Sequence, residues 1–531
     1  MPVIDLTDVA YAWPGGWSLF EGVTLRVPSG HHAALVGANG IGKTTLLRVI
    51  AGEEAPAEGV INLDGRAGYM RQFVAKPAEP TSVRDFLLSF AERPLVEAGA
   101  RLRAAEARLA SGDVGERAQL AYANALGAWE DAGGYRAEVL WDTCTVAAFA
   151  VPFLDAADRP IETLSGGEQK RLALELLFRS PFDVLLLDEP DNYLDIEGKT
   201  WLEEQIRASD KTILFVSHDR ALLAAAATRV VTLEGHGAWV HPDGYATYAE
   251  AREARLERVD EEHRRYAERH RQLIVTMKEM KRKAAYNDKF ASKARSAEKK
   301  VQWHEERESP PEKAAVQHVK MSIDGGRTGK LALRLRGLSL PGLLDPVDTE
   351  ILFGERVGVI GPNGTGKTHF LRLLAGEDVA HTGEWTLGAR VSPGLFAQLH
   401  HRPELRGTPI LEVLQKRGMG MSAAMGTLKR YELERVSRNP FELLSGGQQA
   451  RFQLLLMEVE SPTMLLLDEP TDNLDVHAAE ALEDALSRYE GTVIAVTHDR
   501  WFMRLMDRFL EFEEGGAVRE SLEPPYRLTS L

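Results

Sequence analysis

Two stretches of the chain carry the glycine, lysine and threonine pattern that binds phosphate groups. They read GANGIGKT over residues 37–44 and GPNGTGKT over residues 361–368, and each lies between an apolar run and a helix-like run. In that setting the backbone N–H groups of the glycine-rich turn and the positive end of the following helix face the phosphates, while Lys43 or Lys367 reaches the outer ones. The sequence therefore predicts two phosphate-binding loops, each joining a strand to a helix.

Other motifs of the chain also occur twice. LSGGEQKR pairs with LSGGQQAR, LLLDEP is present in two copies, and FVSHDR pairs with AVTHDR. Ser165 and Ser445 are 280 residues apart, whereas Gln72 and Gln398 are 326 residues apart, so the first copy holds about 46 extra residues between Gln72 and Ser165. That stretch is rich in Ala, Leu, Glu and Arg, and we expect a helical arm over about 80–150.

The order of these motifs resembles the ATP-binding cassette ATPases. A glycine-rich loop, a glutamine, LSGG, LLLDEP and a terminal histidine follow one another in both halves, and five elements in order, twice, leave little room for chance. The resemblance covers most of both halves. It implies an α/β fold with two P-loop ATP-binding cassette domains in tandem, hydrolysis of ATP to ADP and phosphate, and Mg²⁺ as a cofactor beside ATP.

Phosphoryl transfer requires charge neutralisation, a held metal ion and an oriented water. Hydroxyls of the loop threonines and the aspartates that end the LLLD strands are suited to Mg²⁺, and the glutamates that follow are candidates for polarising the attacking water. The resemblance adds the glutamines as metal or water contacts and the terminal histidines as γ-phosphate switches. The candidate catalytic residues are Glu189, Glu469, His218, His498, Gln72 and Gln398, and the candidate metal ligands are Thr44, Gln72, Asp188, Thr368, Gln398 and Asp468.

Each LSGG motif offers a second anion-binding helix terminus, because a serine and two glycines open a helix. In the cassette family this terminus faces the nucleotide held by the other half, so two composite sites are implied. Site one would combine the first loop with Ser445, Gly446 and Gly447, and site two the second loop with Ser165, Gly166 and Gly167, with Asp195 and Asp475 between the sites. Neither copy has lost a catalytic position, so both sites should hydrolyse ATP.

The remaining candidates for nucleotide contact lie in and before the two loops. They are Trp13, Gly37, Asn39, Gly40, Gly42, Lys43, Thr44 and Thr45 in the first half, and Gly361, Asn363, Gly364, Gly366, Lys367 and Thr368 in the second. Trp13 is the candidate for stacking on adenine, with Tyr11 as the alternative, whereas the second half offers only RGLSLPGLLDP there. Site two is therefore expected to bind adenine more weakly or to accept other bases.

The segment after the catalytic glutamate departs from the family pattern. It usually reads PTNHLD, and here it reads PDNYLD and PTDNLD. The first departure places the additional carboxylate of Asp191 near site one.

Charge and cysteine content limit the classes of function. The 531 residues carry a formal net charge of −15, which argues against general nucleic-acid binding but averages over local patches. The one cysteine, Cys144, excludes an intramolecular disulfide and a cysteine zinc module and fits a reducing compartment. No apolar run reaches the ~20 residues of a membrane helix, so we expect a cytoplasmic protein, and a monomer because the fused halves can pair within one chain.

A segment without glycine or proline joins the two halves. It covers residues 245–309, and its apolar residues step by three and four on both sides of a break at AAYND, which predicts an antiparallel helical hairpin. Residues 278–300, which we call the tip, carry nine Lys and Arg against three Asp and Glu, with two aromatic residues among them. Such a tip suits RNA, although a solvated helical linker is the plainer interpretation. The candidate RNA contacts are Lys278, Lys281, Arg282, Lys283, Tyr286, Lys289, Phe290, Lys293 and Arg295.

Two fused cassettes, an arm in the first and a charged hairpin between them resemble the ABC-F family. The expected boundaries are residues 1–249 for the first cassette, 250–318 for the hairpin and 319–531 for the second cassette. The resemblance implies binding to the ribosome, with the tip near P-site tRNA and the peptidyl-transferase centre, for antibiotic resistance or for a housekeeping role in translation. The ATPase subunit of an exporter with separate membrane partners is the first alternative, and a chromosome or DNA-repair ATPase is the second.

Overall fold

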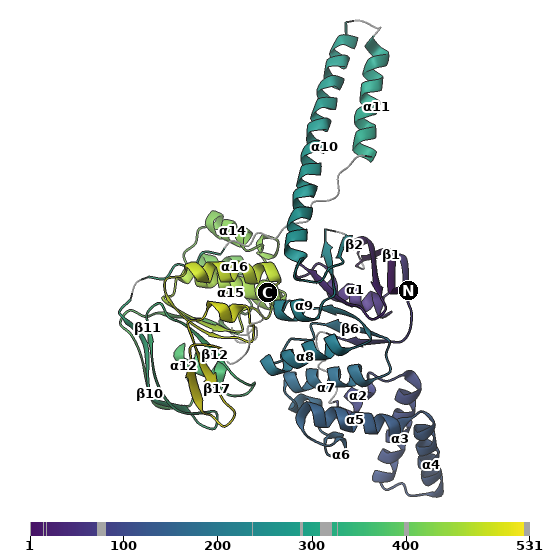
Figure 1. The fold of residues 1–531 in the computed structure, drawn as a ribbon, viewed down its shortest axis with the longest axis vertical. Helices are drawn as coiled ribbons and strands as arrows, with labels where there is room; N and C mark the ends of the chain where they lie inside the picture. Colours follow the sequence, from purple (N-terminus) through teal and green to yellow (C-terminus); the bar gives the residue numbers. More distant parts are fainter. Residues whose placement is uncertain are drawn as a thin grey trace.

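The structure is a computed structural model that describes residues 2–13, 15–16, 18–71, 81–235, 237–286, 290–307, 321–326, 328–397 and 403–524. Three candidate site residues, Gln72, Lys289 and Gln398, lie outside the described residues. Two sheet-based halves lie side by side, and a helical hairpin projects from them (Figure 1). The α/β architecture expected from the sequence, two halves in tandem joined by an antiparallel hairpin, is confirmed.

The main sheet has the same strand order in both halves. In the first half it consists of β3 (His32–Gly37), β5 (Ala67–Met70), β6 (Val184–Asp188), β7 (Thr212–Val216), β8 (Arg229–Glu234) and β9 (Gly237–His241), in the order β5-β6-β7-β3-β8-β9. In the second half it consists of β12 (Arg356–Ile360), β14 (Pro393–Phe396), β15 (Met464–Asp468), β16 (Thr492–Val496), β17 (Arg508–Phe512) and β18 (Val518–Ser521), in the order β14-β15-β16-β12-β17-β18. The repeat in the sequence is therefore a repeat of the fold.

The central strands are apolar throughout because both faces of each main sheet are covered. Every residue of β6, β7, β15 and β16 is buried, as expected for parallel strands between two layers. One layer is a helix with a small antiparallel sheet, formed by β1 (Pro2–Ala12), β2 (Ser18–Pro28) and β4 (Glu58–Leu63) in the first half and by β10 (Leu331–Leu340), β11 (Leu344–Leu352) and β13 (Thr382–Leu387) in the second. The other layer is helical.

Most of the helices around each main sheet begin at or just after a motif. The first half has α1 (Lys43–Ile50), α6 (Phe153–Ala156), a 3₁₀ turn at Ile161–Thr163, α7 (Gly166–Arg179), α8 (Ile196–Ala208) and α9 (Arg220–Ala226). The second has α12 (Lys367–Leu374), α13 (Ile410–Lys416), α14 (Met421–Arg430), α15 (Gly446–Glu460) and α16 (Val476–Arg488), with 3₁₀ turns at Pro403–Leu405, Glu434–Val436, Phe441–Leu443 and Phe502–Leu505. Ser165 and Ser445 open α7 and α15 with capping boxes, which fixes where these helices start.

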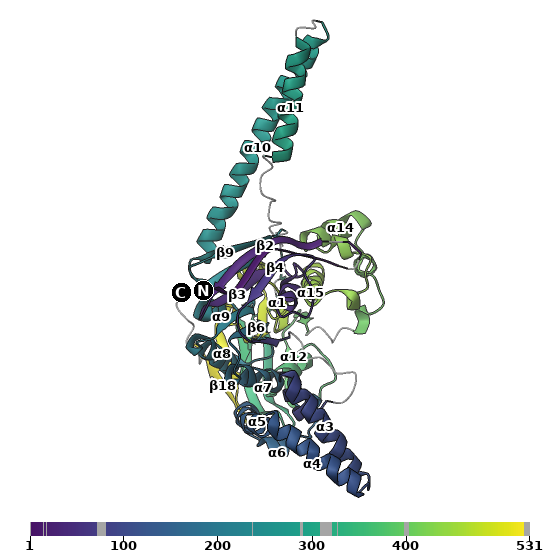
Figure 2. The ribbon, with the colours of Figure 1, turned by 90° about the vertical axis from the view of Figure 1, so that its right-hand side faces the viewer.

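Four further helices lie between β5 and α7. They are α2 (Val83–Leu88), α3 (Arg93–Ala110), α4 (Glu116–Asp131) and α5 (Gly134–Phe149). They extend from the first half at the end of the molecule opposite the hairpin (Figure 2). Trp129, Trp141 and Cys144 are fully buried where these helices meet the core of the first half.

The hairpin consists of α10 (Tyr248–Ala284) and α11 (Ala291–Arg307). At 1.5 Å per residue, α10 is about 55 Å long, and the tip lies far from both sheets (Figure 1). Tyr266, His270 and His304 stack on one another in the stem, with the Tyr266 and His304 rings 4.5 Å apart. No helix within the described ranges combines the length and the apolar character that crossing a membrane requires.

Candidate active sites

The two phosphate-binding loops have the same geometry. Each connects a central strand to a helix, β3 to α1 in the first half and β12 to α12 in the second. The Lys43 ammonium donates hydrogen bonds to the carbonyl oxygens of Gly37 and Ala38, at 2.8 and 3.1 Å. The Lys367 ammonium makes the equivalent two bonds, both at 2.7 Å. Both ammonium groups thus lie over their loops, where phosphate oxygens are the stronger, charged partners.

Glycine is required at the start of each loop. Gly37 and Gly361 have φ of 155° and 138°, where glycine is favoured. A Cβ atom at Gly361 would lie 2.1 Å from the Phe512 carbonyl oxygen, and one at Gly37 would lie 2.6 Å from that of Leu233. A side chain at either position would therefore displace the loop from the neighbouring strand.

Burial lowers the pKa of both loop lysines. The pKa of Lys43 falls to about 8, although Glu189, Asp475 and Asp188 act in the opposite direction. The pKa of Lys367 is lowered for the same reason. A bound triphosphate would favour the charged form of each lysine, because an opposite charge within a few ångströms raises the pKa of an ammonium group.

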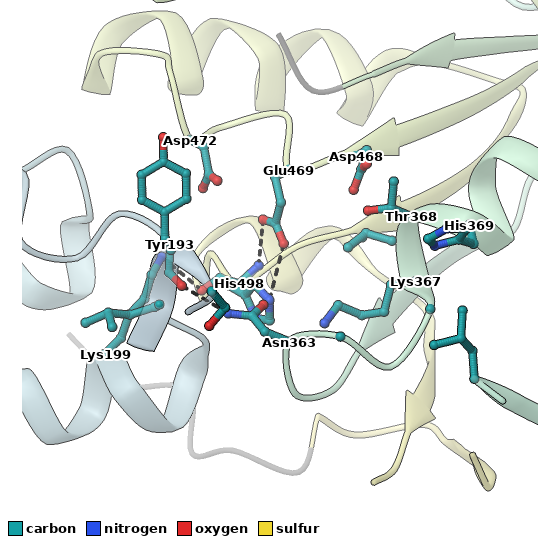
Figure 3. A pocket seen from close by; sticks show the side chains of 18 residues that line it. Tyr193, Lys199, Asn363, Lys367, Thr368, His369, Asp468, Glu469, Asp472 and His498 are labelled. Carbon is teal, nitrogen blue, oxygen red and sulfur yellow. Dashed lines mark hydrogen bonds and ion pairs between the residues drawn. The ribbon is translucent and has the colours of Figure 1, made fainter. Parts of the chain in front are cut away.

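The motif aspartates end β6 and β15 beside the loops. Both carboxylate oxygens of Asp188 are buried and make no hydrogen bond of regular geometry. Burial raises its pKa, while the Thr44 hydroxyl and nearby lysines lower it. A buried carboxylate with available lone pairs beside a hydroxyl suits a hard divalent cation. Asp188 with Thr44 therefore fits a metal ion in site one, and the corresponding Asp468 and Thr368 both line the cavity of site two (Figure 3).

The glutamate after each aspartate has an unusual backbone conformation. Glu189 and Glu469 have φ of 49° and 47°, in the left-handed region that costs a residue other than glycine about 1 kcal/mol or more. A 3.0 Å backbone hydrogen bond holds each one there, from the Glu189 N–H to the Val216 carbonyl and from the Glu469 N–H to the Val496 carbonyl. In this conformation both carboxylate side chains line the cavity of their own site.

The terminal histidines follow β7 and β16, where their surroundings favour the neutral imidazole. Burial, together with Lys43 for His218 and Lys367 for His498, lowers the pKa of each imidazole well below its usual value. In site two, Glu469 Oε2 accepts a hydrogen bond from the His498 backbone N–H at 3.0 Å, and His498 Nε2 lies 3.5 Å from Glu469 Oε1 (Figure 3). A neutral imidazole can contact a phosphate group without adding a second cation to the site.

Each site is completed by the other half. The cavity of site two has a volume of about 340 Å³ and that of site one about 670 Å³. The site-two cavity is lined by Ser165, Gly166 and Gly167 of the first half and by Asn363, Gly364, Gly366, Lys367, Thr368, Asp468, Glu469 and His498 of the second (Figure 3). The site-one cavity is lined by Trp13, Asn39, Gly40, Gly42, Lys43, Thr44, Thr45, Glu189 and His218 of the first half and by Ser445, Gly446 and Gly447 of the second. The structure thus brings each loop together with the LSGG motif of the opposite half.

Loop asparagines make the direct hydrogen bonds across these sites. The Asn39 side-chain amide donates to the Asn473 carbonyl at 3.1 Å, and the Asn363 amide donates to the Tyr193 carbonyl at 3.0 Å. A Cβ atom at Gly447 would lie 2.4 Å from the Asn39 amide nitrogen. The close approach of an LSGG motif to the opposite loop therefore depends on glycine.

The aspartates between the sites cap two helices. Asp195 caps α8 and Asp475 caps α16, and each accepts a 2.9 Å hydrogen bond from the backbone N–H three residues later. Asp475 also accepts a hydrogen bond from the Asn39 backbone N–H of the opposite half, at 3.4 Å. Asp195 acts on the opposite loop through its charge, which opposes the lowering of the Lys367 pKa by burial.

The glutamates of the two sites have different partners. In site one, the Asn192 amide donates to Glu189 Oε2 at 2.6 Å. The equivalent residue in site two is Asp472, which has no amide to donate, and Glu469 accepts a hydrogen bond from the His498 backbone N–H. Burial, followed by the charge of Asp472, raises the pKa of Glu469 well above its usual value.

The ends of the cavities that face the small sheets differ as well. Trp13 lines the site-one cavity with 48% of its surface exposed, and Tyr11 packs edge-on against it, with ring centroids 5.8 Å apart. The turn between β10 and β11 contributes Leu343 to the site-two cavity. Site one thus offers a ring for base stacking, and site two offers an aliphatic surface.

Sequence reasoning missed the ionic contacts that join the halves. Arg220 pairs with Glu483, and Arg500 pairs with Glu203. The two pairs are equivalent, because each residue lies 280 positions from its counterpart, and that recurrence was the signal available. The buried Lys199 also crosses the interface, and its signal was a break in the repeat, since the second half has alanine there.

Comparison with known proteins agrees with this geometry. The family model described as ABC transporter matches residues 20–192 and 344–472. An "Antibiotic resistance protein" of Mycobacteroides abscessus is 47% identical over 99% of this chain and 100% of its own length. "Tylosin resistance ATP-binding protein TlrC" of Streptomyces fradiae is 32% identical over 93% of this chain and 94% of its own. "ABC transporter F family member 2" of Arabidopsis thaliana is 28% identical, covering 95% and 75%.

A solved structure shows the same fold. The archaeal ribosome recycling factor aABCE1, crystallised with the ribosomal stalk protein aP1, superposes with a TM-score of 0.57 at 19% identity, over 97% of this chain and 89% of that one. The family model covers more than half of this chain, and the Mycobacteroides abscessus relative covers nearly all of it. The chain therefore belongs to the ABC transporter family, as a tandem-cassette ATPase of the ABC-F type.

Proposed function

We propose that this ATPase binds the ribosome and acts in translation, with the hairpin tip placed beside P-site tRNA near the peptidyl-transferase centre. The observation that carries the proposal is the exposed basic tip, which α10 and α11 hold far from both ATP sites (Figure 1). The names of two relatives, an antibiotic resistance protein and a tylosin resistance protein, point in the same direction. The expected cellular location is the cytoplasm, and the expected active form is a monomer.

The chemistry of the tip suits RNA. Tyr286 is 89% exposed, and the Lys293 ammonium lies 5.4 Å from the centroid of the Phe290 ring. Exposed rings stack on unpaired bases, and ammonium and guanidinium groups bind phosphates. The exposed basic residues among those described in the tip are Lys278, Lys281, Arg282, Lys283, Lys293, Arg295, Lys299 and Lys300. Two of them form ion pairs within the hairpin, Lys281 with Glu298 and Lys283 with Glu279.

The base of the hairpin connects it to both halves. α10 begins at Tyr248, beside the main sheet of the first half. Arg255 pairs with Glu234 of the first half at 3.0 Å, and Arg252 contacts His477 of the second half. Because α10 contacts both halves, a change in their separation on ATP binding or hydrolysis would change the direction of the hairpin. We propose that ATP binding directs the tip into the ribosome and that hydrolysis releases it.

We assign ATP with Mg²⁺ to both sites. Asp188 and Thr44 would hold the metal ion in site one, and Asp468 and Thr368 would hold it in site two. The bound ion would neutralise charge on the phosphates and polarise them. The side chains of Glu189 and Glu469 would orient the attacking water, His218 and His498 would contact the γ-phosphate, and Gln72 and Gln398 are proposed as further metal or water contacts. Each LSGG motif would close on the nucleotide held by the opposite half.

Protection of the ribosome against an antibiotic is the form of this function that the relatives favour. The 47% identity to an "Antibiotic resistance protein" extends over the full length of both chains. Expression in a susceptible bacterium should therefore raise the inhibitory concentration of a drug that targets the ribosome. Unchanged inhibitory concentrations across several classes of drug that target the ribosome, with growth defects in a deletion strain, would favour a housekeeping role in translation instead.

Trapping the ATP-bound state tests the ribosome assignment. The Glu189→Gln/Glu469→Gln variant should bind ATP without hydrolysing it, since the glutamine cannot accept a proton from water. In sucrose gradients of a lysate we expect it to migrate with ribosomes in the presence of ATP, and to inhibit protein synthesis in a cell-free system. Recovery with membranes alone would contradict the proposal and favour an exporter ATPase.

Charge reversal tests the tip. Lys281→Glu/Arg282→Glu/Lys283→Glu should weaken ribosome binding by a factor of about 10 or more, because each lost phosphate contact also forfeits counterion release. A matched control is Arg264→Glu/Arg265→Glu/Arg271→Glu, which makes the same change of charge at exposed positions of the stem on the same helix. Equal effects of the two variants would mean that net charge, and not the tip, sets the affinity.

A further inference from the structure

We infer that Lys199 of the first half is a positioning residue for ATP hydrolysis in site two. Lys199 lies in the first turn of α8. Its side chain is 8% exposed and lines the site-two cavity together with Glu469 and His498 of the second half (Figure 3). An ammonium group from one half thus reaches the catalytic end of a site whose phosphate-binding loop belongs to the other.

Two contacts fix this ammonium group. Lys199 Nζ lies 3.1 Å from Asp219 Oδ2 in its own half, and it donates to the His498 carbonyl oxygen of the other half at 3.5 Å. Asp219 is itself held, because its Oδ1 accepts hydrogen bonds from the backbone N–H groups of Ala221 and Leu222 at the start of α9. Lys199 therefore ties the segment that carries His498 to a rigid point of the first half.

Carboxylates surround the lysine at the interface. Although burial alone would lower the pKa of Lys199, aspartates of both halves raise it, namely Asp219, Asp472, Asp191 and Asp499. Asp472 belongs to the second half, lines the same cavity as Glu469, and acts on it by repulsion. The ammonium group thus offsets a negative charge next to the carboxylate that is assigned to the attacking water.

The internal repeat explains why site two requires this group. In site one the Asn192 amide donates to Glu189, whereas site two has Asp472 at that position. The counterpart of Lys199 in the second half is Ala479. Site two therefore has no amide at this position to donate to its glutamate. In its place is the carboxylate of Asp472, and a lysine of the opposite half faces that carboxylate. The lysine compensates for the missing amide by holding His498, which donates to Glu469 in its place.

The expected effect of losing the lysine is on turnover. The Lys199 ammonium contacts Asp219 and the His498 carbonyl oxygen, whereas the Lys367 ammonium bonds within its own loop. Lys199→Met in the full chain should therefore lower kcat of site two about tenfold or more and change KM for ATP less than about threefold. Site two is measured in a Glu189→Gln background and site one in a Glu469→Gln background. A loss confined to site two supports the inference, and equal losses in both backgrounds would overturn it.

Rescue separates positioning from a structural role. Lys199→Met/Asp472→Asn should recover turnover to within about threefold of wild type, because the new amide can donate to Glu469 as Asn192 does to Glu189. The rescue is measured in the otherwise unchanged chain as well, so that it does not depend on isolated sites. Lys199→Arg should retain most of the turnover. Parallel losses of kcat and melting temperature that Asp472→Asn does not restore would overturn the inference.

The matched control is Arg207→Met, which removes a long cationic side chain from an exposed position of the same helix. Its turnover should equal that of wild type. The inference rests on the proposed roles of Glu189 and Glu469, and the turnover of the Glu189→Gln and Glu469→Gln chains tests those roles separately. If neither glutamine variant lowers turnover, the roles of the glutamates are wrong; if both do and Lys199→Met does not, only the inference about the lysine is wrong.

Discussion

In site one, Glu189 accepts a hydrogen bond from an amide of its own half, at 2.6 Å. In site two, Glu469 depends on His498, and His498 in turn contacts Lys199 of the opposite half. The two sites have the same loop, LSGG and LLLDEP motifs, yet Glu189 accepts from a side-chain amide, whereas Glu469 accepts from the backbone N–H of a residue that Lys199 of the opposite half contacts. Duplicated motifs can therefore keep their chemistry while the groups that support them diverge.

The ion pairs and asparagine hydrogen bonds that join the two halves are symmetric. Arg220 with Glu483 and Arg500 with Glu203 are equivalent ion pairs, one on each side of the interface. Both loops also place an asparagine amide on a carbonyl of the opposite half. The symmetric contacts bring the halves together, and the asymmetric ones lie next to the glutamates. This division of roles can be tested by substituting residues of the symmetric contacts and residues of the asymmetric contacts separately.

The largest effect is expected from the glutamates themselves. Glu189→Gln/Glu469→Gln should lower ATP turnover about a hundredfold or more, because neither site retains a group that accepts a proton from water. Of the single variants, Glu189→Gln should lose more turnover at saturating ATP, since burial and the neighbouring charge of Asp472 raise the pKa of Glu469 and so disfavour its ionised, proton-accepting form. Steady-state phosphate release measures all three. Equal residual rates for the single variants would contradict the proposed difference between the sites.

The interfacial ion pairs should matter next, through stability. Arg500→Met leaves Glu203 buried without its cation, which typically costs about 3–5 kcal/mol. Arg220→Met should cost less, because Glu483 is 19% exposed whereas Glu203 is 9% exposed. Urea unfolding followed by tryptophan fluorescence measures both. The control is Arg488→Met, whose pair with Asp484 is more than 60% exposed on both sides and should contribute about 0.5 kcal/mol or less. A loss for Arg488→Met as large as for Arg500→Met would refute this ranking.

The carboxylate that distinguishes site two should make stability depend on pH. Burial is the main cause that raises the pKa of Asp472 to about 6, against about 3.9 for an unfolded chain. A raised folded-state pKa means that the contribution to stability is complete below pH ~3.9 and is lost as the pH rises through ~6. Asp472→Asn cannot ionise, so it should be more stable than wild type at pH 8, by about 3 kcal/mol for a difference of about two pKa units, and lose this advantage as the pH falls to about 4.

Thermal unfolding at several pH values measures this difference. Asp484→Asn, at an exposed position on α16, is the control and should show no such dependence. A constant offset between Asp472→Asn and wild type at all pH values would show that Asp472 does not change its ionisation on folding.

The parts of the molecule that could be predicted from sequence are those fixed by short patterns. The loops, the capped helices at Ser165 and Ser445, and the strands before the motif aspartates depend on neighbours within a few residues. The pairing of the halves followed from the repeat together with the family resemblance. The hairpin followed from a long run without glycine or proline, and the structure adds that His270 and His304 stack with Tyr266 in its stem.

What the sequence did not predict depends on how the halves face each other. Lys199 and His498 are 299 residues apart in the chain, and no local pattern places them in contact. The left-handed backbone of Glu189 and Glu469 follows from hydrogen bonds to strands that come later in the chain. Asp191 was expected near site one, and the structure adds that it acts on Lys199 and Asp472 at the interface.

The smallest predicted effect concerns the base. Stacking of a base on an aromatic ring is worth about 1–3 kcal/mol, and Trp13 is 48% exposed, so Trp13→Ala should weaken ATP binding at site one by about fivefold. Leu343→Trp should strengthen binding at site two by a similar factor, because it adds a ring where the cavity has an aliphatic surface. Titration with a fluorescent ATP analogue, in chains where Lys367→Ala or Lys43→Ala disables the other site, measures each affinity.

If Trp13→Ala has no effect while Tyr11→Ala does, the stacking ring is Tyr11. If Leu343→Trp folds normally and leaves the affinity of site two unchanged, stacking does not set the difference between the sites, and their preference for a base must come from contacts with its edge.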